Sequence, residues 1–207
     1  MSLYRDKYRI ESARLKGFDY SSPGEYFVTI CTKGLVEFFG EVIQSKMLRN
    51  EIGGIAHNCW LEIPKHHRNV AIDEFTVMPN HVHGILVLCG RRDHPNGSAS
   101  GIAHTFDDDV PVSDVACNVA PSNINEFMSD ISPKRGSLST MIRSYKSAVT
   151  KLCHANGLED FEWQPRFYDH IIRSNSELGR IRDYIRNNPA KWEADRNNPS
   201  PADLWME

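Results

Sequence analysis

A short turn between two strand-like runs is the feature that most constrains the fold. Val70–Val77 (VAIDEFTV) and His81–Leu88 (HVHGILVL) are rich in β-branched and other apolar residues, as strands are. Only Met78–Asn80 separates them, and such a connection is a tight turn. Two strands joined so closely run antiparallel. The chain therefore contains a β-hairpin, around which its other elements must fit.

Outside the hairpin, the hydrophobic patterns predict two strands and three helices. In chain order they are a strand at Tyr26–Thr32, a helix from Asn50 to about Ile63, a helix at Gly136–Ala155, a strand at the end of Glu162–Arg173, and a helix from Ser174 to about Asn187. This order resembles a ferredoxin-like or RRM-like α+β sandwich, in which helices pack on an antiparallel sheet.

Helix-ending and helix-starting signals set three of these boundaries. Pro64 is expected to end the helix that begins near Asn50. Ser174 and Glu177 have the spacing of a capping box, so the last helix should begin there. Pro189 disfavours helical geometry at the preceding residue, Asn188, and should stop that helix.

The 207 residues suit a single domain, 1–207, with one long insertion. Residues 90–135 are rich in Gly, Ser, Asn, Asp and Pro and show no periodicity, so we expect an inserted surface loop there. This segment carries seven acidic and four basic residues, which accounts for the whole net charge of −3. The remainder of the chain is neutral overall, so its charge permits nucleic-acid binding without indicating it.

Composition excludes several classes of protein. No apolar run approaches the roughly 18 residues that a membrane span needs, and residues 1–17 lack the apolar core of a signal peptide. The five cysteines are widely spaced and contain no CxxC, which indicates neither a disulfide framework nor a cysteine-based zinc site. We therefore expect a soluble cytoplasmic protein with no membrane partner.

Two histidines two residues apart on a strand are the first chemical signal. His81 and His83 share one face of the predicted strand, with their Cβ atoms about 7 Å apart. Two neutral imidazoles at that spacing can hold one divalent cation, zinc included. The structural alternative is that one histidine packs in the core and the other is incidental.

A tyrosine and an asparagine on the last predicted helix are the second signal. Tyr184 and Asn188 lie one helical turn apart on the same face. A tyrosine beside a metal site can act as a nucleophile, although a single helical tyrosine is more often structural. Tyr145 is expected to be buried in its own helix, and Tyr168 has no amide four residues later.

Four stretches together resemble the single-tyrosine HUH transposases, in the branch of REP-associated tyrosine transposases. They are RLKGFDYSSPGEYFVTICT, MPNHVHGILVL, WQPRFYDHIIR and YIRNNPAKW, spread from Arg14 to Trp192. The length of residues 90–135 departs from the compact pattern of that family. His170, in the third stretch, has no role that the sequence explains.

The resemblance implies a role for each matching residue. His81 and His83 would be metal ligands, Asn188 a third ligand through its amide oxygen, and Tyr184 the nucleophile. The metal would be Mg²⁺ or Mn²⁺, which prefer hard oxygen donors. Tyr184 would cut single-stranded DNA near a hairpin, a REP-like palindrome, through a 5′-phosphotyrosine, and strands would then be rejoined.

Contacts to the DNA are predicted from basic residues, and either a monomer or a homodimer is compatible with the sequence. The expected phosphate contacts are Arg14, Lys16, Arg143, Lys146 and Lys151. Two other functions compete with this one. A domesticated hairpin-binding protein would have no physical need for the full set of four site residues. A zinc hydrolase would need a third protein ligand, such as another histidine, that the sequence does not make obvious.

Overall fold

A computed structural model describes residue 15 and residues 17–90 and 134–198. Its main sheet has four strands: β1 (Gly24–Cys31), β4 (Val70–Val77), β5 (His81–Leu88) and β6 (Tyr168–Ile172). Their order across the sheet is β4-β5-β1-β6, and all three neighbouring pairs are antiparallel. The hairpin formed by β4 and β5 has the bounds that the sequence predicts.

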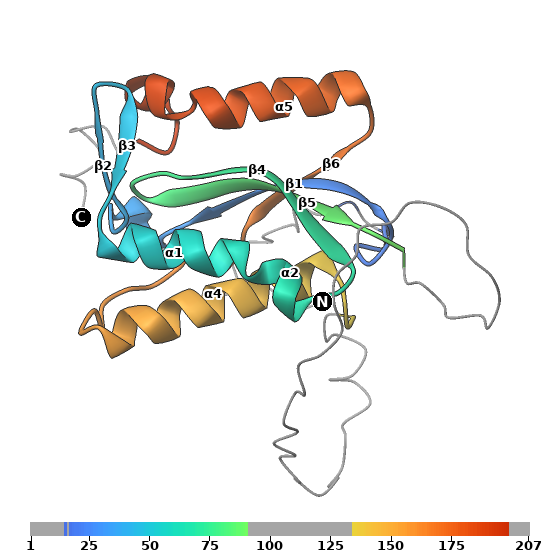
Figure 1. Cartoon of the computed structure of the whole chain (residues 1–207), viewed down its shortest axis with the longest axis horizontal. Coiled ribbons are helices and arrows are strands. Elements are labelled where there is room, and N and C mark those ends of the chain that lie inside the picture. Colours follow the sequence, from blue (N-terminus) through green and yellow to red (C-terminus); the bar gives the residue numbers. More distant parts are fainter. Residues whose placement is uncertain (1–14, 16, 91–133, 199–207) are drawn as a thin grey trace, which may run out of the picture. The chain divides into compact units, whose positions relative to one another are not determined.

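Helices cover both faces of this sheet, as Figure 1 shows. α1 (Glu51–Leu61), α2 (Ile63–His66) and α4 (Leu138–Ala155) lie on one face, and α5 (Asn175–Asn187) lies on the other. The elements of the main sheet and its helices follow one another as strand, helix, strand, strand, helix, strand, and β5 and β1 are the two central strands. This is the ferredoxin-like arrangement. The α+β sandwich expected from the sequence is therefore confirmed.

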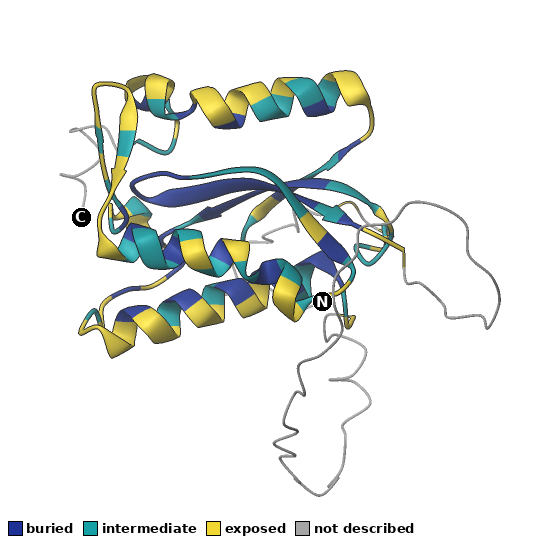
Figure 2. Ribbon diagram, viewed as in Figure 1, coloured by how far each residue is buried: buried dark blue, intermediate teal, exposed yellow. Residues whose placement is uncertain are grey.

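Each face of the sheet has its own apolar cluster, visible as the buried ribbon between the layers in Figure 2. The larger cluster lies under α1 and α4 and contains large side chains such as Trp60, Tyr145 and Trp163. The smaller cluster lies under α5. Its members are Phe27, Ile85, Ile172, Leu178 and Ile185. The helix that carries Tyr184 is thus held by less apolar packing than the opposite layer.

Strand register decides which side chains reach the α5 face. Alternate residues of a strand point to opposite faces, and Ile85 of β5 packs under α5. His81 and His83 share that parity, so both imidazoles lie on the α5 side. Thr29 of β1 pairs with His83 on one side and with Tyr168 of β6 on the other. This row across three strands forms the floor of the site described below.

Two of the sequence-based explanations of helix ends are corrected by the structure. Pro64 does not simply end a helix: α1 ends at Leu61, and Pro64 lies in the first turn of α2, where its missing N–H is not needed. Asn188 has helical backbone angles, φ −59° and ψ −43°, despite the proline that follows. α5 ends at Asn187 as expected, but the chain continues directly into the 3-10 helix η2 (Pro189–Ala194).

A two-stranded ribbon was not predicted from the sequence. β2 (Gly40–Ile43) and β3 (Lys46–Arg49) pair antiparallel and precede α1, after a short 3-10 turn, η1 (Lys33–Leu35). Both strands have only four residues, and their turn uses Gln44 and Ser45 in the left-handed region. Two-residue hairpin turns with positive φ prefer Asn-Gly, Asp-Gly or Gly-Gly, and Gln44-Ser45 is none of these, so the sequence gives no hairpin signal here.

Three further expectations, on the insertion, on membrane spans and on the cysteines, meet the described residues only in part. The proposed insertion at 90–135 falls largely on residues 91–133, which lie outside the described residues. No helix in the described ranges is long and apolar enough to cross a membrane. Among the described residues, Cys31, Cys59, Cys89 and Cys153 are free thiols.

Gly84 leads to a first prediction. A Cβ atom at Gly84 would lie 2.3 Å from Cζ2 of the buried Trp60, so Gly84→Ala should destabilise the fold by about 1–3 kcal/mol. Urea denaturation measures the change. Gly54→Ala is the matched control, because a Cβ there meets nothing within 4 Å and alanine favours the helix. A stability of Gly84→Ala equal to that of the control would contradict the close packing of Trp60 on the sheet.

Candidate metal and tyrosine site

The two histidines of β5 lie side by side on the α5 face, as the sequence predicts. Their ring centroids are 4.4 Å apart, and both residues are almost fully buried. Trp192 of η2 packs against the His81 ring, with 5.9 Å between centroids, while Phe27 stacks on the His83 ring at 5.4 Å. The two imidazoles are therefore held in fixed positions by packing.

Hydrogen bonds at Nδ1 require a free Nε2 on His81 and are compatible with a free Nε2 on His83. His81 Nδ1 lies 2.8 Å from Asn80 Oδ1, an acceptor, so Nδ1 carries the proton and donates it. His83 Nδ1 lies 2.9 Å from the Thr29 hydroxyl, which can accept in the same way. Both Nε2 atoms then present lone pairs, which is the form that metal ligation requires.

The histidines are also neutral. Burial lowers the pKa of His81 to about 4; the Asp195 carboxylate acts in the opposite direction, and Arg196 adds to the lowering. Burial lowers the pKa of His83 well below its ordinary value, and the neighbouring charges of His81 and Arg196 lower it further. A neutral imidazole can ligate a cation, whereas an imidazolium cannot.

Tyr184 of α5 faces this pair. Its hydroxyl lies 3.1 Å from His83 Nε2, and 38% of the residue is exposed to solvent. Burial raises the pKa of Tyr184, as does the charge of Asp195, while the charge of Arg196 and a hydrogen bond with Asn188 lower it. The hydroxyl is thus next to the histidines and open to a substrate.

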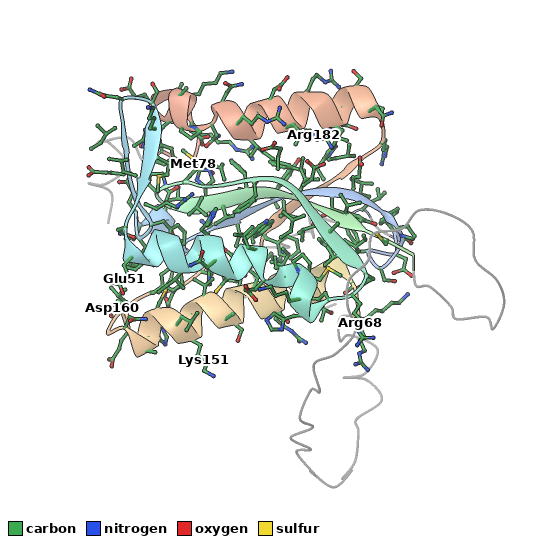
Figure 3. The ribbon with its side chains drawn as sticks, viewed as in Figure 1. Glu51, Arg68, Met78, Lys151, Asp160 and Arg182 are labelled. Atoms are coloured by element: carbon green, nitrogen blue, oxygen red, sulfur yellow. The ribbon has the colours of Figure 1, made fainter. Side chains whose placement is uncertain are left out.

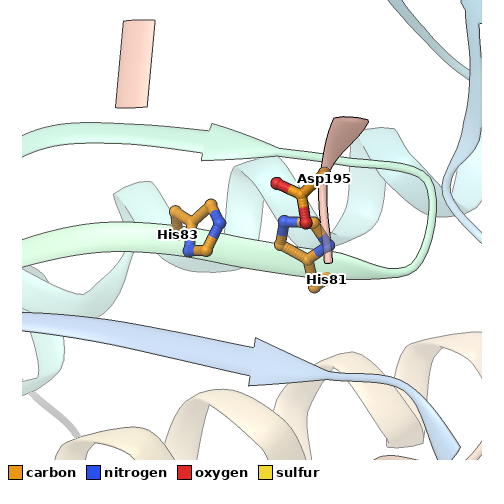
Figure 4. Close-up of side chains that lie close together, drawn as sticks. All are labelled: His81, His83 and Asp195. Atoms are coloured by element: carbon orange, nitrogen blue, oxygen red, sulfur yellow. The ribbon is translucent and has the colours of Figure 1, made fainter. Parts of the chain in front are cut away.

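Asn188 and Asp195 complete the polar cluster. Asn188 is buried, and its Nδ2 donates to Asp195 Oδ2 over 2.9 Å. The ligand atoms of His81, His83 and Asp195 all lie within 4.8 Å of one another (Figure 4). Ligand atoms that share one cation at about 2.0–2.6 Å are at most roughly 5 Å apart, so this spacing suits a divalent ion.

Unsatisfied buried atoms test whether a cation fits here. In the described part of the chain, His81 Nε2 and Asn188 Oδ1 are buried without a hydrogen-bond partner. A buried polar atom left without a partner costs about 1–3 kcal/mol. Both are lone-pair donors beside a carboxylate, and a divalent cation is a partner that would satisfy both. The residues present therefore fit a metal ion.

Ion pairs, rather than a large apolar face, fix α5 over β4. A bulge in β4 between Ile72 and Phe75 presents two carboxylates to the helix. Arg182 binds Asp73 through two nitrogens, Nε at 3.0 Å and Nη2. Arg186 binds Glu74 in the same way from the next turn of α5. Figure 3 labels Arg182 on this helix. The Arg182 guanidinium holds the pKa of Asp73 below its ordinary value.

His170, which the sequence left without a role, anchors the start of the same helix. Its Nε2 lies 2.8 Å from Glu177 Oε1, and Glu177 Oε2 accepts from the backbone N–H of Arg173. The hydroxyl of Ser174 accepts from the N–H of Glu177, which is one half of the predicted capping box. The other half differs, because Glu177 accepts from the N–H of Arg173 in place of that of Ser174. Glu177 thus ties the first turn of α5 to β6, which shares the sheet with the histidines.

A relative of known sequence matches most of the length of this chain. No family model matches the chain. An uncharacterized protein of Haemophilus influenzae is 33% identical over 186 residues, which cover 89% of this chain and 91% of the relative. The chain belongs to the family of this Haemophilus protein.

Two solved structures are also similar. One is a REP-associated tyrosine transposase bound to a REP hairpin, with a TM-score of 0.45, 22% identity, and coverage of 93% of this chain and 74% of that one. The other is a candidate transposase from Deinococcus radiodurans, with a TM-score of 0.39, 15% identity, and coverage of 84% and 97%.

The basic residues predicted to bind DNA are not gathered at this site. Arg143, Lys146 and Lys151 all lie on α4, across the sheet from Tyr184; Lys151 is labelled on that outer layer in Figure 3. Lys146 Nζ donates to the backbone carbonyl of Gln164, so it is engaged within the protein. Arg14 and Lys16 lie outside the described residues. DNA contact by these five residues stays a prediction.

Three residues of the site were missed in the sequence. Thr29 and Asn80 orient the histidines. Asn80 stands directly before His81, where its residue type predicts a turn and gives no sign of this second role. Asp195 lies beyond the expected end of the last helix, and no local pattern marks it. Only the 3-10 helix η2, which turns the chain back over β5, brings its carboxylate to the histidines.

Proposed function

We propose that this protein is a metal-dependent tyrosine transposase that cuts and rejoins single-stranded DNA near hairpins, with Tyr184 as its nucleophile. One observation carries the proposal: the partly exposed Tyr184 hydroxyl lies 3.1 Å from His83 Nε2, beside the cluster of His81, His83 and Asp195. The motif resemblance supports the same chemistry. A hydroxyl, oriented bases and a metal-ligating cluster are the parts that phosphoryl transfer through a covalent intermediate needs.

In the proposed reaction, the Tyr184 oxygen attacks a phosphorus atom of the strand in line with the bond to the 3′ oxygen. That bond breaks, which leaves a 5′-phosphotyrosine and a free 3′-hydroxyl. The phenolic proton leaves and the 3′ oxygen gains a proton, so the step is proton-neutral. Attack by another 3′-hydroxyl on the phosphotyrosine reverses the chemistry and rejoins strands without ATP.

The residues of the chain position these groups. His83 Nε2 holds the Tyr184 hydroxyl, and α5 is fixed by its ion pairs to β4. His81, His83, Asp195 and Asn188 would hold the cation, with two nitrogen and two oxygen donors. When bound, a divalent ion supplies positive charge that polarises the scissile phosphate. We propose Mg²⁺ or Mn²⁺; because Asp195 offers the third ligand that a zinc site requires, Zn²⁺ is included in the test.

A covalent adduct tests the proposal. Full-length protein is incubated with a pool of hairpin oligonucleotides whose flanking single strands are randomised, with Mn²⁺, Mg²⁺ or Zn²⁺ or with EDTA. We expect a band of shifted mobility on a denaturing gel that depends on metal. A 3′ label should travel with the protein and a 5′ label should not, because the 5′ phosphate joins Tyr184.

Two results would contradict the proposal. Hairpin binding without cleavage or adduct in any metal would indicate a DNA-binding protein without catalysis. Cleavage without an adduct would indicate a hydrolase in which water, and not tyrosine, attacks the phosphate.

A further inference from the structure

Arg196 is an exposed cation at the edge of the site. Its guanidinium carbon lies 5.8 Å from the centroid of the Tyr168 ring, within the range of a cation–π contact. Among the described residues, no carboxylate forms an ion pair with it, whereas Arg182 and Arg186 of the neighbouring helix are both paired. Its charge is therefore not neutralised by a partner within the described chain.

The backbone that carries Arg196 is fixed. Asn198 N–H donates to the carbonyl of Asp195, which closes a turn, and Asn197 N–H donates to the Asp195 carboxylate over 2.7 Å. The buried Asn80 donates to the carbonyl of Asn197, also over 2.7 Å. Asn80 also bonds His81, so the turn with Arg196 and the histidine share one hydrogen-bonded support.

Arg196 lies on the reactive side of the sheet. Tyr168, over which it sits, occupies the same row as Thr29 and His83 on three adjacent strands. Phe27 contacts the rings of both Tyr168 and Tyr184, with centroids 6.4 Å and 6.1 Å apart.

We propose that Arg196, held against the ring of Tyr168, binds a phosphate of single-stranded DNA next to the Tyr184 hydroxyl. The guanidinium group matches phosphate oxygens with paired N–H donors. Here it is exposed, has no ion pair among the described residues, and is set on a hydrogen-bonded turn. The aromatic ring of Tyr168 limits its rotamers and leaves the outer N–H groups free. The inference rests on the proposed function for its substrate, but it concerns binding and requires no cleavage.

Binding of a short unpaired oligonucleotide, without hairpin and without metal, tests the role of Arg196. Fluorescence anisotropy is measured over a range of salt in the Tyr184→Phe background, so that no reaction occurs. We expect Arg196→Gln to weaken binding about tenfold and to flatten the salt dependence by about 0.7 in log–log slope, the value for one phosphate contact on a single strand. Arg196→Lys should keep the slope and recover part of the affinity.

Arg68→Gln is the matched control. Arg68 is also exposed but precedes β4, at the end of the sheet away from His81, and its loss should leave both affinity and slope unchanged (Figure 3). Equal behaviour of Arg196→Gln and Arg68→Gln would overturn the proposal. Thermal melting of each variant shows that the fold is retained.

Variants of Tyr168 test how Arg196 is held. Tyr168→Leu removes the aromatic ring and should weaken binding. In the Arg196→Gln background the same substitution should add little, because the two residues act through one contact. Additive losses would contradict the coupling. If the parent protein forms the DNA adduct but Arg196→Gln binds DNA as tightly as its parent does, this inference is refuted and the proposed function stands. If no adduct forms but Arg196→Gln binds more weakly, the proposed function is refuted and this inference stands.

Discussion

Tyr184→Phe is expected to lower the rate of DNA cleavage by several orders of magnitude and to leave DNA affinity nearly unchanged. The substitution removes only the hydroxyl, which no neighbouring group can replace as a nucleophile. The ring keeps its edge contact with Phe27, so the packing of α5 is retained. Single-turnover cleavage and anisotropy measure the two quantities.

Tyr168→Phe is the control for this experiment. Among the described residues, Tyr168 is a second exposed tyrosine on the same face, 44% exposed, and its hydroxyl has no proposed part in the reaction. It should cleave as the parent protein does. Tyr145 is excluded as a rival, as expected, because it is buried and its hydroxyl donates to the carbonyl of Ala56. If Tyr168→Phe lost all DNA cleavage while Tyr184→Phe still cleaved DNA, Tyr168 and not Tyr184 would be the nucleophile.

The second large effect concerns the metal. At a concentration of Mn²⁺ one hundred times its dissociation constant, binding should stabilise the fold by about 2.7 kcal/mol, and His81→Ala should remove most of this gain. The reason is that His81 Nε2 is a buried donor with no other partner in the described chain. Melting temperatures with and without Mn²⁺ measure the difference, and comparison within each variant cancels any loss of fold stability.

The same measurement tests each of the two proposed oxygen ligands, Asp195 and Asn188, by itself. Asp195→Ala and Asn188→Ala should each reduce the metal-dependent shift, whereas His66→Ala should not, since His66 is exposed on α2, on the other face of the sheet. A full shift in Asp195→Ala would show that its carboxylate only supports Asn188 through their hydrogen bond. A full shift in His81→Ala would contradict the metal site altogether.

The sequence predicts the parts of this molecule that depend on local pattern. The β4–β5 hairpin, the shared face of His81 and His83, and the capping box at Ser174 each follow from spacing within a few residues. Those rules are local because strand and helix periodicities are local. The ferredoxin-like order then follows from counting elements in sequence.

The missing parts depend on contacts between distant segments. Asp195 reaches the histidines only because Asn188 stays helical before Pro189 and η2 folds back, against the usual preference of a residue before proline. Thr29 meets His83 through the pairing of β1 with β5, 54 residues apart in sequence. Such pairings have no pattern within either segment, so a single sequence cannot identify them.

The most direct test of the central claim is identification of the residue that carries the DNA. The covalent adduct is digested with protease and nuclease, and the modified peptide is sequenced by mass spectrometry. The account predicts one nucleotide remnant, joined through a 5′ phosphate to the Tyr184 oxygen. A remnant on Tyr168 or on any other residue, or a 3′ linkage on Tyr184, would contradict it.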